Sequence, residues 1–252
     1  MVLLDFSLTK LGGAIYDNFS RVIVFIAIIA CVFLIAGFSE VIINNVNKTK
    51  PSKKFKIHKI TIIAMLSAVA ILLNLLSFPL WFAPGFYKLD FSELPVLVGA
   101  FALGPLAGVT IEAVKILLNL VINGTSTAFI GEIANFVVGC AFVIPAAIVY
   151  YHKRTKKGAV IGLVVGTVVN LVASCAMNAY VLIPVYGEMF HMDVIGAGTK
   201  VNAAITDMTT FILYAVAPFN LIKCVAVAVI TALIYKPVSK LISGVKGLEK
   251  NR

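Results

Sequence analysis

The chain has 252 residues, of which 61% are hydrophobic and only 13% are charged, and its mean hydropathy is +1.03. Soluble globular domains carry about a quarter charged residues, so this composition excludes a soluble domain and predicts a protein that spans the membrane several times. The apolar runs are continuous rather than alternating with a period of two, which favours spanning helices over strands. The expected fold class is therefore an all-α membrane protein.

The net charge is +10, and its placement bears on both topology and partners. Three segments, 48–59, 152–157 and 236–252, hold 15 of the 21 Lys and Arg residues. Such clusters are typical of cytoplasmic loops rather than of a nucleic-acid surface. Placing all three inside predicts a multi-pass protein of the cell membrane, in contact with lipid and not nucleic acid. It has seven spans, the N-terminus outside and the C-terminus in the cytoplasm.

The predicted elements begin with a span at 22–43 and a polar, basic linker at 44–59. The positive charge follows the apolar run, which argues for a retained anchor rather than a signal peptide. We therefore expect residues 1–54 to form an extra N-terminal transmembrane helix with a basic cytoplasmic linker, and residues 55–252 a six-helix membrane domain. The helices predicted for that domain are 60–80, 94–103, 107–122, 131–151, 158–183 and 210–235.

Two segments between these helices are unusual. The aromatic stretch 78–95 contains Pro and Gly residues that preclude one regular helix, and Ser92 near its end is a predicted N-cap for the next helix. Residues 184–208 show no strong periodicity, and their length indicates a lid or a binding loop.

An isolated charge inside a span costs about 2.5–3.5 kcal/mol and marks a functional hypothesis, and four ionisable side chains inside predicted spans stand out. They are Glu112, Lys115, Glu132 and Lys223. Glu112 and Lys115 are three residues apart on one helix, so a structural pair between them is the favoured interpretation. Glu132 lies in the first turn of its helix, where capping explains a carboxylate as well as binding does.

Amide side chains share faces with two of these charges. Asn135, one turn deeper than Glu132, has no capping role to explain it. Asn220 and Lys223 are three residues apart, and the distance of Lys223 from Lys236 prevents it from reaching the cytoplasmic surface. We expect Lys223 to donate to a ligand, with a pair to Glu112 or Glu132 as the alternative. Asn178, Tyr180 and Tyr186 lie near the outer end of the preceding span.

Amides, one Lys, hydroxyls and aromatic rings in the outer half of the membrane suit a flat heteroaromatic ligand that carries hydroxyl groups. The sequence contains no phosphate-binding loop, nucleophile–base pair or HExxH motif, so we expect neither an enzyme nor a metal site. The small residues Ala64 and Ala68, with Ser67 beside them, favour close approach of another helix, and ordinary internal packing is an equally good explanation.

The segments FYKLDFSELPVLVGAFALGPLAGVTIEAVKILLNL, GTSTAFIGEIANF and PFNLIK, in this order, resemble the riboflavin-specific S components (the RibU family) of energy-coupling factor (ECF) vitamin transporters. The resemblance covers roughly residues 59–239. It implies a six-helix membrane protein that binds riboflavin from outside and docks on one transmembrane T subunit and two ATPase subunits. Riboflavin is then the transported ligand, and no cofactor is expected. In this family small residues on the first core helix form the docking surface, which fits Ala64, Ser67 and Ala68.

The resemblance also implies where the vitamin is held: in the first outer loop and by polar side chains on the last two helices. Together with the hydroxyl, acid and amide of the GTSTAFIGEIANF segment, the expected binding residues are Phe86, Tyr87, Leu89, Asp90, Phe91, Thr125, Glu132, Asn135, Asn178, Asn220 and Lys223.

Two features depart from the family pattern: the additional N-terminal span and the long segment 184–208, which makes the assignment of Asn178 less direct and leaves flavin nucleotides as possible ligands. The alternatives are an S component for thiamine, a folate or pantothenate, a lipid-modifying membrane enzyme, and a structural scaffold. Carboxylate-bearing vitamins would need more cations than Lys223, a lipid enzyme would need a reactive cluster at one interface, and an intramembrane Lys–Asn pair argues against a scaffold.

Overall fold

The computed structural model describes residue 16 and residues 19–46, 53–152 and 154–247. The remaining parts of the three basic segments, at 48–52, 153 and 248–252, lie outside the described residues. Residues 1–15 and 17–18, which belong to the expected N-terminal unit, also lie outside the described residues.

Ten α-helices are described: α2 (Phe19–Val46), α3 (Lys53–Leu75), α4 (Glu93–Leu103), α5 (Pro105–Asn123), α6 (Ile130–His152), α7 (Lys156–Met177), α8 (Ile183–Phe190), α9 (Val194–Thr199), α10 (Met208–Phe211) and α11 (Ala217–Gly247). The π-helical turns η1 (Asn178–Leu182) and η2 (Ile212–Val216) join α7 to α8 and α10 to α11 without a break. Two short strands, β1 (Phe78–Pro79) and β2 (Lys88–Leu89), pair in antiparallel fashion.

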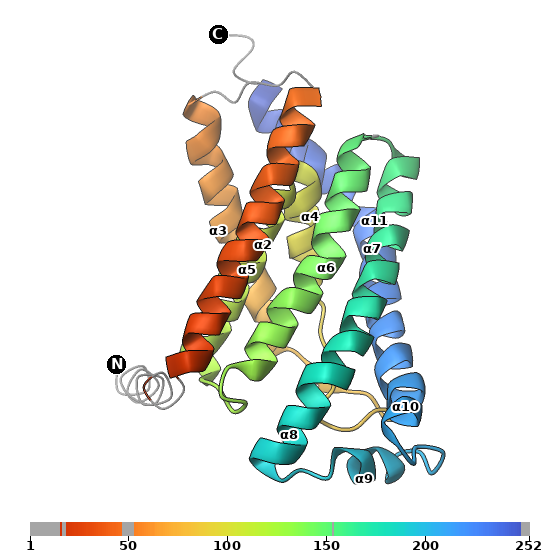
Figure 1. Cartoon of the computed structure of the whole chain (residues 1–252). Helices are drawn as coiled ribbons and strands as arrows, with labels where there is room; N and C mark the ends of the chain where they lie inside the picture. Colours follow the sequence, from red (N-terminus) through yellow and green to blue (C-terminus); the bar gives the residue numbers. More distant parts are fainter. Residues whose placement is uncertain (1–15, 17–18, 47–52, 153, 248–252) are drawn as a thin grey trace.

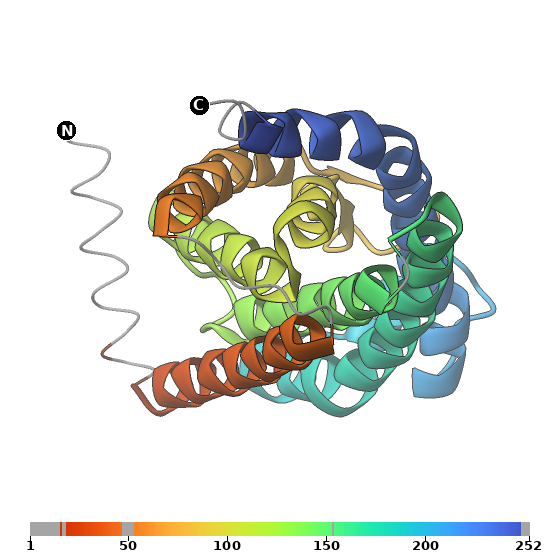
Figure 2. The same cartoon turned by 90° about the horizontal axis from the view of Figure 1, so that it is seen from above.

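The described residues include six helical stretches that are long and apolar enough to cross a membrane, and α4 is a shorter apolar helix of 11 residues. The expected fold class is confirmed: a six-helix core of α3, α4, α5, α6, α7–α8 and α10–α11, with α2 as an additional helix. Figure 2 shows α4 enclosed by the other core helices, while α2 lies outside that ring against α5 and α6.

The two ends of the bundle differ. At the end that carries α8, α9 and α10, short helices and loops lie across the bundle (Figure 1). We call it the α9 end, and the opposite end, with the α6–α7 turn, the His152 end. Because α4 fills the centre only toward the His152 end, the space near the α9 end is left to the loop between α3 and α4.

Two segments differ from the sequence-based expectation. Helix α3 begins at Lys53, so the last part of the predicted basic linker is helical and the second span ends earlier, at Leu75. The segment 184–208 is not a continuous loop, because α8 extends to Phe190 and α9 follows after three residues. The side chain of Asp193 accepts a hydrogen bond from the backbone N–H of Gly196 at 2.7 Å and starts α9 as its N-cap.

The bend between α4 and α5 attaches α2 to the core. Gly104 has φ +114° there, a conformation that favours glycine, and Pro105 follows in the first turn of α5. The carboxylate of Glu40 from α2 lies against this bend, where it accepts a hydrogen bond from the backbone N–H of Leu106 at 3.3 Å. The other carboxylate oxygen of Glu40 pairs with Lys59 Nζ of α3 at 2.9 Å. The Glu40 carboxylate therefore accepts a hydrogen bond from a backbone N–H that has no partner within α5, and it joins α2 to α5 and α3.

Candidate functional site

The loop between α3 and α4 brings polar groups into the bundle. In its hairpin Phe78 pairs with Leu89 and Pro79 pairs with Lys88. Successive residues of a strand point to opposite sides, and Lys88 is exposed while Leu89 is only 5% exposed. The chain then turns, so that Asp90 is buried as well.

This loop closes over a cavity of about 280 Å³ that is bounded by the core helices and contains both polar and aromatic side chains. Small-molecule sites are concave, with a few polar groups placed among apolar ones. The polar and aromatic side chains that line it are Asn74, Ser77, Phe86, Tyr87, Lys88, Asp90, Ser92, Glu93, Lys115, Asn119, Asn135, Phe142, Asn170, Ser174, Asn178, Phe219, Asn220 and Lys223.

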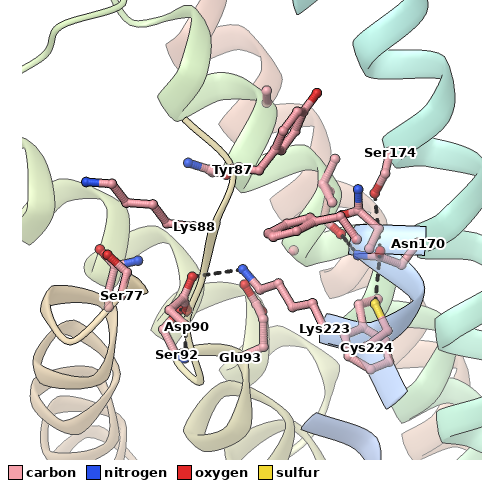
Figure 3. Close-up of a pocket in the computed structure, with 18 of the residues that line it drawn as sticks. Ser77, Tyr87, Lys88, Asp90, Ser92, Glu93, Asn170, Ser174, Lys223 and Cys224 are labelled. Atoms are coloured by element: carbon pink, nitrogen blue, oxygen red, sulfur yellow. Dashed lines mark hydrogen bonds and ion pairs between the residues drawn. The ribbon is translucent and has the colours of Figure 1, made fainter. Parts of the chain in front are cut away.

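Lys223 and Asp90 form an ion pair at one side of the cavity (Figure 3), with 2.8 Å between Lys223 Nζ and Asp90 Oδ2. The Lys223 side chain remains 21% exposed, so its ammonium is not fully enclosed by protein. The other oxygen of Asp90 accepts hydrogen bonds from the Ser92 backbone N–H at 2.8 Å and the Ser92 hydroxyl at 2.5 Å. Neither alternative partner for Lys223, Glu112 or Glu132, is therefore its ion-pair partner.

The surroundings of Asp90 determine its charge. Burial on its own would raise the pKa of this carboxyl, but the ammonium groups of Lys223 and Lys115 and the hydrogen bonds from Lys223 and Ser92 lower the pKa to about 2. Ser92 is the residue before α4, as predicted for its N-cap, but its side chain makes no capping bond to the helix, because the hydroxyl donates to Asp90.

Lys115 continues this cluster on α5. Its ammonium lies 2.7 Å from Glu112 and 2.9 Å from Glu93, and it donates to Ser92 Oγ at 3.2 Å. The predicted Glu112–Lys115 pair is confirmed, but the sequence reasoning missed Glu93. Lys115 also lines the cavity, so its pairing with Glu112 does not keep it away from the candidate site. We call Asp90, Ser92, Glu93, Glu112, Lys115 and Lys223 the cavity-floor cluster; in it three acidic side chains share two ammonium groups.

Asparagine side chains form the walls. The Asn220 amide donates to the Val216 carbonyl at 2.9 Å, and the Asn178 amide donates to the Ser174 carbonyl at 2.8 Å. The Asn135 side chain is exposed and lines the cavity, and it makes no hydrogen bond with the described part of the chain. These amides therefore have capacity left for a ligand.

Aromatic rings cover the cavity at its loop side. The Tyr87 ring lies with its centroid 4.8 Å from Phe86, 5.3 Å from Phe219 and 6.3 Å from Phe211. Its hydroxyl donates to the side-chain oxygen of Asn178, which starts the π-helical turn η1. Burial, followed by the nearby Tyr186 and Cys175, raises the pKa of Tyr87, so the phenol stays neutral. The loop is thus tied to the end of α7 by a neutral hydrogen bond.

Seven of the eleven expected binding residues line this cavity: Phe86, Tyr87, Asp90, Asn135, Asn178, Asn220 and Lys223. The other four do not. Leu89 and Phe91 pack in apolar clusters behind the loop. Thr125 donates to Glu132 Oε2 at 3.1 Å and accepts from the Phe129 backbone N–H at 3.0 Å, which organises the turn before α6.

The polar and aromatic lining residues that sequence reasoning missed are Asn74, Ser77, Lys88, Ser92, Glu93, Lys115, Asn119, Phe142, Asn170, Ser174 and Phe219. Asn170 and Ser174 carried a detectable signal, because positions 170, 174 and 178 follow one another at intervals of four residues and so share one helical face. Asn74, Lys88 and Asn119 lie near the ends of their elements, where a polar residue is ordinary. Tyr180, which had been singled out, is 82% exposed on the outer surface.

The small residues expected at a partner surface divide between two faces of α3. Ala64 and Ala68 are exposed, whereas Ser67 is buried and donates to the Ile63 carbonyl at 2.8 Å. Only the two alanines are therefore presented outward.

Comparisons with known proteins agree with these features. A family described as "ECF transporter, substrate-specific component" matches residues 58–235. The chain is similar to the "Riboflavin transporter RibU" of Staphylococcus aureus (strain TCH60), with 34% identity over 174 residues that cover 69% of this chain and 86% of the relative. It is also similar to the "Riboflavin transporter FmnP" of Bacillus subtilis (strain 168), with 31% identity over 183 residues that cover 71% of this chain and 91% of the relative.

A solved structure, described as "Structure and mechanism of the S component of a bacterial ECF transporter", has a TM-score of 0.58 and 30% identity to this chain. The similarity covers 73% of this chain and 96% of that one. Helix α2 lies before the matched residues 58–235.

Proposed function

Because this chain belongs to the substrate-specific components of ECF transporters, we propose that it is the membrane subunit that binds riboflavin for uptake. The observation that carries the proposal is the cavity itself. Amides, the incompletely buried side chain of Lys223 and aromatic rings in tilted contact line one cavity in a largely apolar bundle. Riboflavin combines a flat heteroaromatic ring system with a hydroxylated side chain, and these groups match that lining.

The charges of the cavity-floor cluster also support an uncharged ligand. Lys223 is paired with Asp90 and Lys115 is paired with two acids, so the deep end of the cavity offers no spare positive charge. A carboxylate brought to this floor would lose its hydration without gaining a free cation. This disfavours folate and pantothenate as ligands.

The ligand enters from outside. Lys59, Arg154, Lys156 and Lys157 belong to the His152 end, which the positive-inside rule places in the cytoplasm. The α9 end, with the aromatic loop and the cavity beneath it, then faces outward. The start of α2 also lies at the α9 end (Figure 1), which supports the proposed orientation with the N-terminus outside.

Release to the cytoplasm needs partner subunits, since the chain has no phosphate-binding loop of its own. The proposed partners are the T subunit and two ATPase subunits of an ECF transporter. Ala64 and Ala68 on the exposed face of α3 are the proposed T-subunit contact, because small residues allow close helix–helix packing. Ser67 is not included, since it packs inward. Residues 55–252 form the proposed substrate-binding unit, with the N-terminal helix as an addition to it.

Riboflavin fluorescence tests the proposal. The purified full chain in detergent should quench riboflavin emission with a stoichiometry of one and should leave thiamine unbound in a competition assay. A preparation that is folded, judged by its helical circular dichroism, yet leaves riboflavin emission unchanged would contradict the substrate assignment.

A further inference from the structure

The outward side of the loop between α3 and α4 is apolar. Residues 75–86 contain no acidic residue. Their exposed large apolar side chains are Leu75, Leu76, Phe78, Trp81 and Phe86. Trp81, the single tryptophan of the chain, is 89% exposed. An apolar patch of this kind is typical of a surface that contacts protein or membrane, not of a loop surrounded by water.

The Trp81 side chain rests on the aromatic layer that covers the cavity. Its ring makes an edge-to-face contact with Phe82, with the ring centroids 5.5 Å apart. Phe82 packs against a cluster that contains Leu89 and Phe219, and Tyr87 packs against the same cluster. This layer therefore borders the cavity through Tyr87 and Phe219, while Trp81 is exposed on its outward side and does not line the cavity.

The position of the loop along the bundle is that of a membrane–water interface. The loop begins where the apolar helix α3 ends, at Leu75. Exposed aromatic side chains also occur near the α9 end of three other spans: Phe19 at the start of α2, Tyr180 in η1 and Tyr214 in η2. Aromatic residues of this kind are enriched where a span passes from the hydrocarbon into the headgroup layer. Trp81 lies at the corresponding end of α3.

A basic side chain accompanies the apolar ones. Lys88 pairs with Pro79 in the β1–β2 hairpin and is exposed, and its ammonium makes no ion pair or hydrogen bond with the described part of the chain. The acidic residue of the loop, Asp90, is buried and paired with Lys223. Lysine side chains near the end of a span extend toward the headgroups, where lipid phosphates provide a counter-charge. The outward surface therefore combines apolar groups with a cation, which is the chemistry that lipid complements.

We propose that the loop between α3 and α4 is seated in the lipid interface at the α9 end of the bundle, with Trp81 as its anchor and Lys88 directed to the phosphates. Tryptophan suits this layer because its ring is large and apolar while its N–H can donate to headgroup oxygens. The loop that covers the cavity is then held on two sides. Tyr87 and Asp90 bind it to the bundle, and Trp81 binds it to the bilayer.

Tryptophan fluorescence tests the lipid contact directly, because Trp81 is the single tryptophan and its emission reports this loop alone. The purified full chain is reconstituted into phosphatidylcholine vesicles without riboflavin. Quenching is measured with lipids brominated at different depths of the acyl chains, and with iodide present on both sides of the membrane. We expect bromines close to the headgroups to quench Trp81 most, bromines near the chain ends to quench it less, and iodide to quench it little.

Two reference variants move the tryptophan to another level in a Trp81→Phe background. Met65→Trp places it at an exposed position in the middle of α3, where bromines near the chain ends should quench most. Lys200→Trp places it at the exposed C-terminal end of α9, where iodide should quench most. Trp81 should emit at shorter wavelength than the tryptophan at position 200 and at longer wavelength than the one at position 65.

Strong quenching of Trp81 by iodide with little quenching by lipid would place the loop in water and overturn the inference. Quenching by neither would mean that protein, such as a second copy of the chain, covers Trp81, and would overturn it as well. Helical circular dichroism verifies that each variant is folded. None of these measurements uses riboflavin, so their outcome is independent of the proposed substrate.

Discussion

Two clusters of charged side chains lie within the helical bundle, and they differ in what they face. Glu40 of α2 contacts the α4–α5 bend and Lys59 of α3, and its carboxylate accepts a hydrogen bond from a backbone N–H in the first turn of α5. The cavity-floor cluster instead borders an open space, so that Lys223 and Lys115 contact both their acid partners and the cavity. The first cluster joins helices; the second borders the cavity that we propose holds the ligand.

This difference shows that a charge inside a span need not indicate a binding site. Glu40 lies inside the first span, but its partners, the Leu106 backbone and Lys59, serve to pack helices together. Lys115 was judged structural from the same kind of reasoning, yet it lines the cavity. We therefore expect changes at Glu40 or Lys59 to alter stability alone, and changes in the cavity-floor cluster to alter ligand affinity as well.

The largest expected effect comes from Lys115→Met. Removing this ammonium leaves Glu93 and Glu112 buried without their shared counter-charge, and breaking a buried pair in this way costs about 3–5 kcal/mol. The thermal unfolding temperature should fall strongly. The double variant Lys115→Met with Glu112→Leu should recover part of the lost thermal stability. If Lys115→Met alone were as stable as the original protein, the cluster would not be charged as described.

Lys223→Ala is expected to weaken riboflavin binding by roughly a hundredfold, since it removes a donor and leaves Asp90 unpaired beside the ligand. Lys59→Ala is the matched control: it also removes the ammonium of an ion pair, the one with Glu40, but borders no part of the cavity. Titrations by fluorescence quenching compare the two. Similar losses of affinity in both variants would remove the distinction between the clusters.

Glu40→Gln should lower the free energy of unfolding by about 1 kcal/mol, because the amide retains an acceptor for Leu106 but loses the charge that faces Lys59. Riboflavin affinity should stay unchanged within error. A shift in affinity without a change in unfolding temperature would mean that α2 acts on the binding site.

The smallest expected effect is that of Asp90 on pH dependence. Its pKa is lowered to about 2, compared with about 3.9 in an unfolded chain. The stabilisation from its charged form is therefore complete above about pH 5 and is lost as the pH falls toward 2. Riboflavin affinity should show no inflection due to Asp90 between pH 8 and pH 5. An inflection in that window that disappears in Asp90→Asn would contradict the ion-paired assignment.

Most of the fold could be predicted from the sequence. Continuous apolar runs gave the spans, because the bilayer requires about 20 apolar residues per helix and leaves few other solutions. The break at Gly104 and Pro105 could also be predicted, because Gly and Pro interrupt helices. The start of α3 could not, since a basic segment is compatible with a helix that extends beyond the membrane.

The site was predictable only in part. Asn135, Asn220 and Lys223 could be found because amides and charges are costly in a span and share helical faces. Thr125 and Glu132 have the same chemistry, but their hydrogen bonds to each other and to the local backbone keep them at the turn before α6. Composition alone does not separate these two cases.

The amino-acid sequence by itself determined that this is a helical membrane protein of the S-component family, with polar side chains placed inside its apolar helices. Only the tertiary structure decided which charges meet. Asp90 and Lys223 are 133 positions apart, and Glu40 and Leu106 are 66 apart. No local pattern encodes such pairs, because they depend on how the loop between α3 and α4 folds back into the bundle and on where α2 packs against α5.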